Sequence, residues 1–262
     1  MPRMLRSVLA LLLALASAPA FAQTRPLLTE EAATAPEGTL VLEAGGDYIR
    51  REPNFLTGGE RDRWDGPVLR LVYSAARNVE LDLEWVGRVG AIADPDFGSV
   101  SDFGDVTLRA KVNFLEEDRA APGIAARFAV TLPETSFGNG LGPNALRMSA
   151  QLIVSRTLGR TAFHANAGLA IHDEVERPHE QRDFFAYGLA VVRPVGSRLW
   201  AVAEVAGRAG KGAPGAEERA EARAGLRFGG GRIRWDAALR RGLAAADGGW
   251  GITAGLAWTI RP

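Results

Sequence analysis

The chain has 262 residues, 31 basic and 31 acidic side chains, and no cysteine. The balanced charge gives no support for a nucleic-acid partner, and the lack of cysteine excludes disulfides, thiol chemistry and cysteine-ligated metal sites. After residue 22 no stretch approaches the roughly 18 consecutive apolar residues of a transmembrane helix.

Residues 1–22 have the features of a cleavable signal peptide. Arg3 and Arg6 are followed by an apolar stretch too short to span a bilayer stably, and Ala20-Phe21-Ala22 is an A-x-A cleavage site. We therefore expect export across the inner membrane and removal of residues 1–22. Residues 23–38 contain two prolines and no strand pattern. They are either a segment that tucks into the interior of the following domain or a loose tail.

Residues 39–262 contain repeated alternation of apolar and polar side chains. In 78–88 the apolar set is Val79, Leu81, Leu83 and Trp85, and the charged set is Glu80, Asp82, Glu84 and Arg88. Side chains alternate between faces along a strand, so this period of two predicts strands. We expect about twelve, at 39–49, 67–75, 78–88, 105–114, 124–132, 146–155, 162–171, 184–193, 198–209, 219–228, 232–243 and 250–260.

The connections add independent information, because long and short ones alternate along the chain. The longer set is 50–66, 91–103, 133–145, 173–183, 210–217 and 244–249. Outer-membrane barrels have short periplasmic turns and longer external loops, which matches this alternation. A soluble sandwich or lipocalin-like barrel also alternates, but its strands are usually shorter than these five or six apolar positions require.

Aromatic side chains cluster toward both ends of the predicted strands, as expected at the two membrane interfaces. One rim would hold Tyr48, Trp85, Phe185 and Trp250, and the other Tyr73, Phe114, Phe163, Phe228, Trp235 and Trp258. The predicted fold class is therefore all-β, a transmembrane antiparallel up-and-down β-barrel over residues 39–262. The predicted location is the outer membrane.

If the apolar face meets lipid, the polar face lines the lumen. The candidate lumen-lining residues are Glu43, Asp47, Arg70, Glu80, Asp82, Glu84, Arg88, Asp105, Arg109, Lys111, Arg127, Arg147, Gln151, His164, Asn166, Glu204, Arg208, Arg223, Arg227, Arg234, Asp236 and Arg240. Both charge signs are mixed, so two interpretations stay open: a polar channel whose charges select solutes, or a lumen closed by ion pairs. Residues 23–38 would plug such a lumen if Glu30 and Glu31 paired with arginines such as Arg127 or Arg147.

The histidines suggest no strong site. His172 and His179 are expected in one acidic loop, where carboxylates and imidazoles could bind a divalent ion, although such runs are usually solvated loop charges. His164 is expected in the lumen near Ser155, a pairing that would suit a hydrolase if a third group oriented it. We predict no metal, no cofactor and no catalytic residues.

Several short motifs resemble one family of outer-membrane barrels. They are Pro26-Leu27-Leu28-Thr29-Glu30-Glu31-Ala32, Pro36-Glu37-Gly38, Leu40-Val-Leu-Glu43, Asp102-Phe103-Gly104-Asp105-Val106 with Lys111, Leu132-Pro133, and Gly138 to Gly142. Together they resemble the family named "putative MetA-pathway of phenol degradation". The resemblance implies a transporter-like barrel for aromatic or other hydrophobic compounds.

We therefore expect an outer-membrane channel or transporter for small molecules with a charged lumen. The alternatives are a structural or surface barrel with a closed lumen and, less favoured, an outer-membrane lipid hydrolase. The expected partners are outer-membrane lipid, an unidentified small-molecule solute, and the barrel-assembly machinery and periplasmic chaperones that serve this class.

Overall fold

The computed structural model describes residues 25–177 and 179–261. The predicted signal peptide, residues 1–22, lies outside the described residues, as do residues 23 and 24. No helix in the described part of the chain is long and apolar enough to cross a bilayer.

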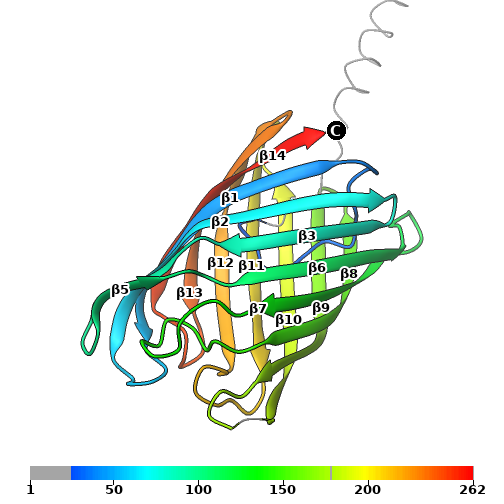
Figure 1. The fold of residues 1–262 in the computed structure, drawn as a ribbon. Coiled ribbons are helices and arrows are strands. Elements are labelled where there is room, and N and C mark those ends of the chain that lie inside the picture. The colour runs from blue at the N-terminus through cyan, green and yellow to red at the C-terminus, as the bar shows by residue number, and fades with distance from the viewer. Residues whose placement is uncertain (1–24, 178, 262) are drawn as a thin grey trace, which may run out of the picture.

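The strands form one antiparallel sheet that closes on itself (Figure 1). The first strand, β1, pairs with both its successor, β2, and the last strand, β14, so the wall has no free edge. The twelve strands of the wall are β1 (Leu40–Pro53), β2 (Glu60–Ala76), β3 (Val79–Val86), β6 (Val106–Leu115), β7 (Gly123–Leu132), β8 (Arg147–Leu158), β9 (Thr161–Asp173), β10 (Gln181–Pro194), β11 (Leu199–Ala209), β12 (Arg219–Gly230), β13 (Ile233–Gly242) and β14 (Trp250–Arg261).

The predicted transmembrane barrel of about twelve strands is confirmed, and the expected segments coincide with the wall strands. Segments 184–193 and 198–209, whose inner faces have few polar groups, form β10 and β11 and pair from Phe185↔Ala209 to Pro194↔Trp200. Part of their inner surface is apolar because it packs against another segment: Leu27 forms a buried cluster with Ala190 and Val202.

Two segments that were predicted to be loops are partly strand. Residues 50–66 were expected to be a loop, but β1 continues to Pro53 and β2 begins at Glu60. Residues 91–103 include the hairpin of β4 (Val89–Asp94) and β5 (Gly98–Asp102), which extends the wall beyond β3 and β6. The extensions of β1 and β2 carry charged residues at consecutive positions, 50–52 and 60–63, so alternation could not reveal them, and β4 and β5 have only six and five residues.

The inner and outer faces exchange at the base of this extension. Gly66-Pro67 on one strand and Gly87-Arg88 on its neighbour interrupt the regular pairing between β2 and β3–β4. Strict alternation would place Arg88 in the lumen, and that prediction was wrong. Arg88 is exposed, donates to Ser101 Oγ (2.9 Å) and lies over the exposed Phe103 ring.

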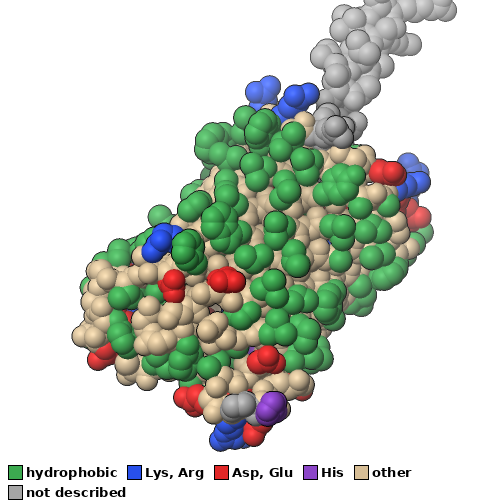
Figure 2. All heavy atoms as spheres, in the orientation of Figure 1, with side chains coloured by type: hydrophobic (Ala, Val, Ile, Leu, Met, Phe, Trp, Pro, Cys, Tyr) green, Lys and Arg blue, Asp and Glu red, His purple; other side chains and the backbone are tan. Residues whose placement is uncertain are grey.

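Apolar side chains cover the outer wall. Figure 2 shows them across the visible flank, with most charged side chains near the two ends of the barrel. Leu81 is 47% exposed and Leu189 is 64% exposed, fractions that suit lipid contact but would be costly across a whole wall in water. The exposed aromatics of the predicted rims include Trp85, Phe185, Trp250, Tyr73, Phe114, Phe163, Phe228, Trp235 and Trp258.

The two faces should respond differently to a new charge. Leu81 lies on a rung of paired residues that runs through Ala110 and Phe128 to Ala150, and Ser149, beside that rung, faces the lumen. A lipid-facing arginine near the bilayer centre costs about 2–4 kcal/mol, whereas a lumen arginine keeps water. We expect Leu81→Arg to reduce the folded fraction strongly and Ser149→Arg to be tolerated, as measured by the heat-dependent shift of the folded barrel on SDS gels. Equal defects in the two variants would mean that the faces are assigned wrongly.

Candidate functional site

The segment before the first strand lies inside the barrel. Residues 25–38 have no strand or helix of their own, yet Leu27, Thr29, Glu30, Ala32 and Ala35 are all buried. Each contacts inner-face residues of distant strands rather than its own neighbours. We call residues 25–38 the lumen segment.

Lumen side chains satisfy the backbone of this segment. Both carboxylate oxygens of Glu204 accept backbone hydrogen bonds, from Leu28 N and Thr29 N, each at 2.8 Å. Arg223 donates to Pro26 O (2.7 Å) and Arg227 to Arg25 O (2.7 Å). Buried backbone groups need such partners, and this segment, which has no strand pairing, finds most of them in side chains.

The second half of the lumen segment is held in the same way. Ala32 N donates to Ser155 Oγ (2.8 Å) and Ala35 N to Glu80 Oε1 (2.6 Å). Asn113 donates to Ala32 O (2.7 Å), and Lys111 donates to Ala33 O (2.9 Å) while pairing with Glu80. The anchors therefore come from many parts of the wall.

Glu30 is the segment's charged anchor. Its carboxylate pairs with Arg127 (2.9 Å) and Arg70 (3.0 Å). Burial alone would raise the pKa of Glu30, but Arg127 and Arg70 outweigh it and hold the pKa below its ordinary value. Glu30 thus stays ionised and binds the segment electrostatically at physiological pH. The expected partner Arg147 pairs with Asp105 instead.

The remaining lumen charges mostly pair across neighbouring strands. Asp82 bridges Arg70 (2.7 Å) and Arg109 (2.9 Å), and Glu84 also contacts Arg109 (2.9 Å). On the opposite wall Glu221 pairs with Arg223 (2.5 Å) and with Arg240. Apart from Arg88, the predicted lumen-lining residues lie on the inner face of the described structure, where they join this network, lie beside the lumen segment or line a cavity.

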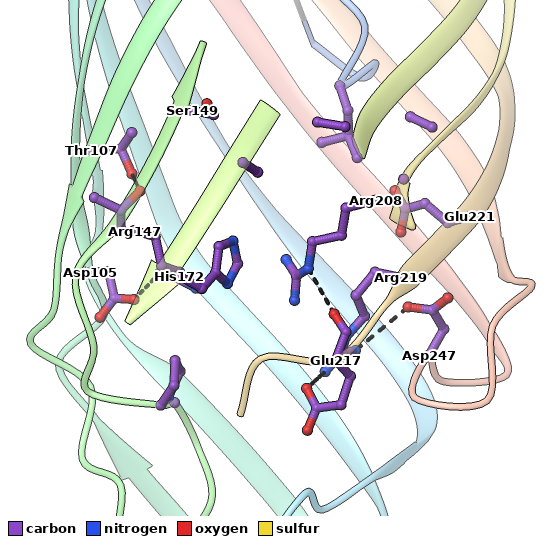
Figure 3. Close-up of a pocket in the computed structure, with 18 of the residues that line it drawn as sticks. Asp105, Thr107, Arg147, Ser149, His172, Arg208, Glu217, Arg219, Glu221 and Asp247 are labelled. Atoms are coloured by element: carbon purple, nitrogen blue, oxygen red, sulfur yellow. Dashed lines mark hydrogen bonds and ion pairs between the residues drawn. The ribbon is translucent and has the colours of Figure 1, made fainter. Parts of the chain in front are cut away.

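A cavity of about 590 Å³ lies at the end of the lumen where the longer loops gather. Figure 3 shows side chains from several strands converging on it, among them Arg147, His172, Arg208 and Arg219. Arg147 pairs with Asp105, and Arg219 pairs with Glu52 (3.2 Å). We call this space the outer cavity.

Asp105 organises one side of the outer cavity. Its Oδ1 accepts hydrogen bonds from Glu134 N, Thr135 N and Thr135 Oγ1, at 2.9 to 3.0 Å, while Oδ2 contacts Arg147. The preceding Gly104 is needed because a Cβ there would lie 2.5 Å from Val86 O. The Gly-Asp pair thus lets one strand approach its neighbour closely and fixes the loop that follows β7.

A second, smaller cavity of about 220 Å³ lies along the lumen segment. Arg25, Pro26, Leu27, Leu28 and Glu30 contribute to its wall. Leu28 also borders the outer cavity, together with lumen residues such as Arg127 and Arg223. The lumen segment therefore lies where the two spaces meet.

Ser155 and His164 do pair, with 2.8 Å between Oγ and Nδ1. The pair lies beneath the lumen segment, because Ser155 Oγ also accepts the Ala32 amide. Among the described residues, His164 forms no ion pair with a carboxylate, and the hydrogen bond of its ring is to Ser155. A catalytic serine and histidine normally need a third group that orients the histidine, and Ser155 and His164 have none among the described residues. Here Ser155 anchors the lumen segment through the Ala32 amide.

The prediction that His172 and His179 lie in one loop was wrong. His172 belongs to β9 and faces the lumen, whereas His179 lies in the loop that follows, so the two do not share a loop. The loop carboxylate of Glu174 pairs with Arg177 (3.6 Å) and Arg182. No group of three potential metal ligands occurs within the described residues.

Sequence patterns missed the residues that close the outer mouth. Arg61 contacts Asp94 (3.0 Å) and Asn139 O (3.0 Å), and Asn54 donates to Asp94 (3.0 Å). These residues come from the strand extensions and an external loop, where no periodicity marks the inner face. The only local signals were Gly66-Pro67 and the run of charges at 60–63, which are common in ordinary loops.

Comparison with known proteins gives one family. The family model described as "Putative MetA-pathway of phenol degradation" matches residues 24–259, so the resemblance in the sequence is confirmed. No curated protein matches the chain.

Solved structures show the same fold at low sequence identity. An outer membrane channel from Pseudomonas putida F1 is 16% identical with a TM-score of 0.68, covering 87% of this chain and 98% of that one. The β domain of the Bordetella autotransporter BrkA is 11% identical with a TM-score of 0.54, covering 86% and 100%. The translocator domain of the autotransporter NalP from Neisseria meningitidis is 12% identical with a TM-score of 0.50, covering 84% and 86%.

Glu204 offers a direct test of how the lumen segment is held. Glu204→Ala removes both acceptors of the Leu28 and Thr29 amides, and Glu204→Gln retains one oxygen. Since a hydrogen bond to a charged group contributes about 1.5–3 kcal/mol, we expect these amides to exchange hydrogen at least about tenfold faster in the alanine variant and less so in the glutamine variant. Hydrogen exchange with mass spectrometry measures this, with exposed Glu218→Ala as the control. Unprotected amides in the unmodified protein would contradict the anchoring.

Proposed function

Because the chain belongs to the "Putative MetA-pathway of phenol degradation" family, we propose that it is an outer-membrane channel for small molecules whose lumen is closed by its own N-terminal segment. The observation that carries the proposal is the way in which residues 25–38 are held. Side chains of the lumen bind this segment, and no strand pairing ties it to the wall.

Two features support a passage rather than a solid core. Cavities of about 590 and 220 Å³ adjoin within one barrel, and the lumen segment borders both. Charged inner faces retain water when a segment leaves, whereas an apolar core would collapse. Displacement of residues 25–38 would therefore join the two spaces into a wet, charged pore.

The proposed solutes are small aromatic or hydrophobic compounds. The family description names phenol degradation, and the similar barrel from Pseudomonas putida F1 is described as an outer membrane channel. Outer-membrane location follows from the same proposal, because the barrel's apolar wall needs lipid.

A structural barrel with a permanently closed lumen is the second candidate. It is favoured by the density of lumen ion pairs, such as Asp82 with Arg70 and Arg109, which fill the wall side of the passage. The two candidates differ in one property, namely whether the barrel conducts once residues 25–38 are absent.

Removal of the lumen segment is the decisive test. We expect deletion of residues 25–36, with the signal and its cleavage site retained, to raise single-channel conductance in planar bilayers while leaving the heat-dependent gel shift intact. Raised salt should lessen the difference in open probability between the full and truncated barrels, because it weakens ion pairs such as Glu30–Arg127 that hold the segment. A truncated barrel that assembles but does not conduct would establish the structural alternative.

A reversible version controls for damage caused by deletion. The native chain has no cysteine, and Ala32 N lies 2.8 Å from Ser155 Oγ, so Ala32→Cys with Ser155→Cys can tether the segment. The oxidised double variant should remain closed under conditions that open the single variants, and reductant should restore opening.

A further inference from the structure

Arg208 of β11 and His172 of β9 face the outer cavity (Figure 3). Phe184 of β10, the strand between β9 and β11, contacts both side chains. The Arg208 guanidinium lies over the Phe184 ring, 5.4 Å from its centroid. The His172 ring meets the same ring edge-on at 5.2 Å. One buried aromatic side chain therefore positions two polar groups toward a common space.

Arg208 is held in place but not neutralised. Its Nε donates to Glu217 O (2.8 Å), which fixes the plane of the guanidinium. Within the part of the chain that the structure describes, no carboxylate forms an ion pair with Arg208 and its two terminal nitrogens make no hydrogen bond. By contrast, Arg147 and Arg219, which share the cavity, are each paired with a carboxylate.

His172 is a second polar group without a protein partner. Its side chain is 5% exposed, and its buried Nδ1 has no hydrogen bond. Among the described residues nothing bonds to the other ring nitrogen either. Nδ1 is shielded from the cavity, but His172 lines the cavity, so the other ring nitrogen is the atom available to a ligand there. With its proton on Nε2, His172 would offer a donor there.

The surrounding wall is apolar and shaped by small residues. Ala170, Ala186 and Ala206 line the outer cavity, and Ala170 and Ala186 pack with Phe184 in one buried cluster. The cavity volume of about 590 Å³ falls in the range of small-molecule sites. Nine arginines and seven carboxylates line this space, so its charge balance favours anions.

We propose that Arg208 and His172, both positioned by Phe184, form a binding site for small organic carboxylates, in which an aromatic acid places its carboxylate on Arg208 and its ring against the alanine wall. The two terminal nitrogens of a fixed guanidinium match the two oxygens of a carboxylate. His172 donates to the same carboxylate or to a ring hydroxyl. This inference deepens the proposed function, on which it rests for its role in solute passage.

Equilibrium binding to the purified full-length mature barrel in detergent tests the site without requiring transport. Isothermal titration with benzoate should show binding. Benzamide, which keeps the ring and loses the charge, and acetate, which keeps the charge and loses the ring, should each bind at least tenfold more weakly. Arg208→Gln should weaken benzoate binding about tenfold to hundredfold, the loss expected for a charge-assisted contact. Arg208→Lys should recover only part of the affinity, because lysine lacks the planar fork.

Arg241→Gln is the matched control. Arg241 belongs to the neighbouring part of the same rim and also lies over an aromatic ring, Trp250, at 5.3 Å, but on the outer face of the wall. Its loss should leave benzoate affinity unchanged, and the heat-dependent gel shift should show that both variants fold. His172→Phe should weaken benzoate binding severalfold while keeping the ring packing against Phe184.

The outcomes separate this site from the proposed function. Equal affinity for benzoate and benzamide, or an unchanged affinity in Arg208→Gln, would overturn the site even if the truncated barrel conducts. Equal binding of acetate and benzoate would overturn the apolar half of the site. Specific benzoate binding in a barrel that never conducts would uphold the site and overturn the channel.

Discussion

The structure depends on one constraint, which is that backbone polar groups surrounded by lipid must find their hydrogen bonds within the chain. A sheet meets this requirement only by closing, and here β14 returns to β1 across ten paired positions. Closure gives every strand one face toward lipid and one toward the lumen. The period of two, the exposed leucines and the internal charges all follow from that division. For the same reason most charged side chains of the membrane-spanning wall point into the barrel, where many of them pair with one another.

Charged side chains of the lumen form hydrogen bonds to the backbone of the lumen segment as well as ion pairs with one another. Glu204 accepts two amides, and Lys111 and Asn113 donate to carbonyl groups of the segment. Strand pairing would have made residues 25–38 a permanent part of the wall. Side-chain anchors in a polar lumen are individually weak because water can replace them. A segment bound in this manner can be both ordered and removable, which is the physical requirement for a plug.

The sequence predicted the wall well because lipid enforces strict alternation, as in Leu81 and Asp82. The prediction of strands and of their inner faces failed where the wall extends beyond the lipid. Beyond the bilayer both faces of a strand meet water, so the extension of β2 through Arg61 looked like a loop and Arg88 was placed on the wrong face. Contacts of the lumen segment were also beyond reach, since Leu28 and Glu204 lie 176 residues apart. Two acidic residues in a tail do not indicate which of many lumen arginines they will contact.

The inner face of β10 and β11, which has few polar groups, explains how one wall holds a segment and also leaves a cavity. Toward the short-turn end Leu27 packs against Ala190, and a Cβ at Gly188 would lie 2.5 Å from Thr29 Oγ1, so any larger residue there would displace Thr29. Farther out the segment no longer covers the wall, and small residues such as Ala186 leave open volume. The same choice of small side chains therefore fits a backbone at one depth and leaves open volume at the next. In the proposed channel, bulkier residues at the outer positions would fill that volume without disturbing the segment, so this stretch of wall would limit solute size independently of closure.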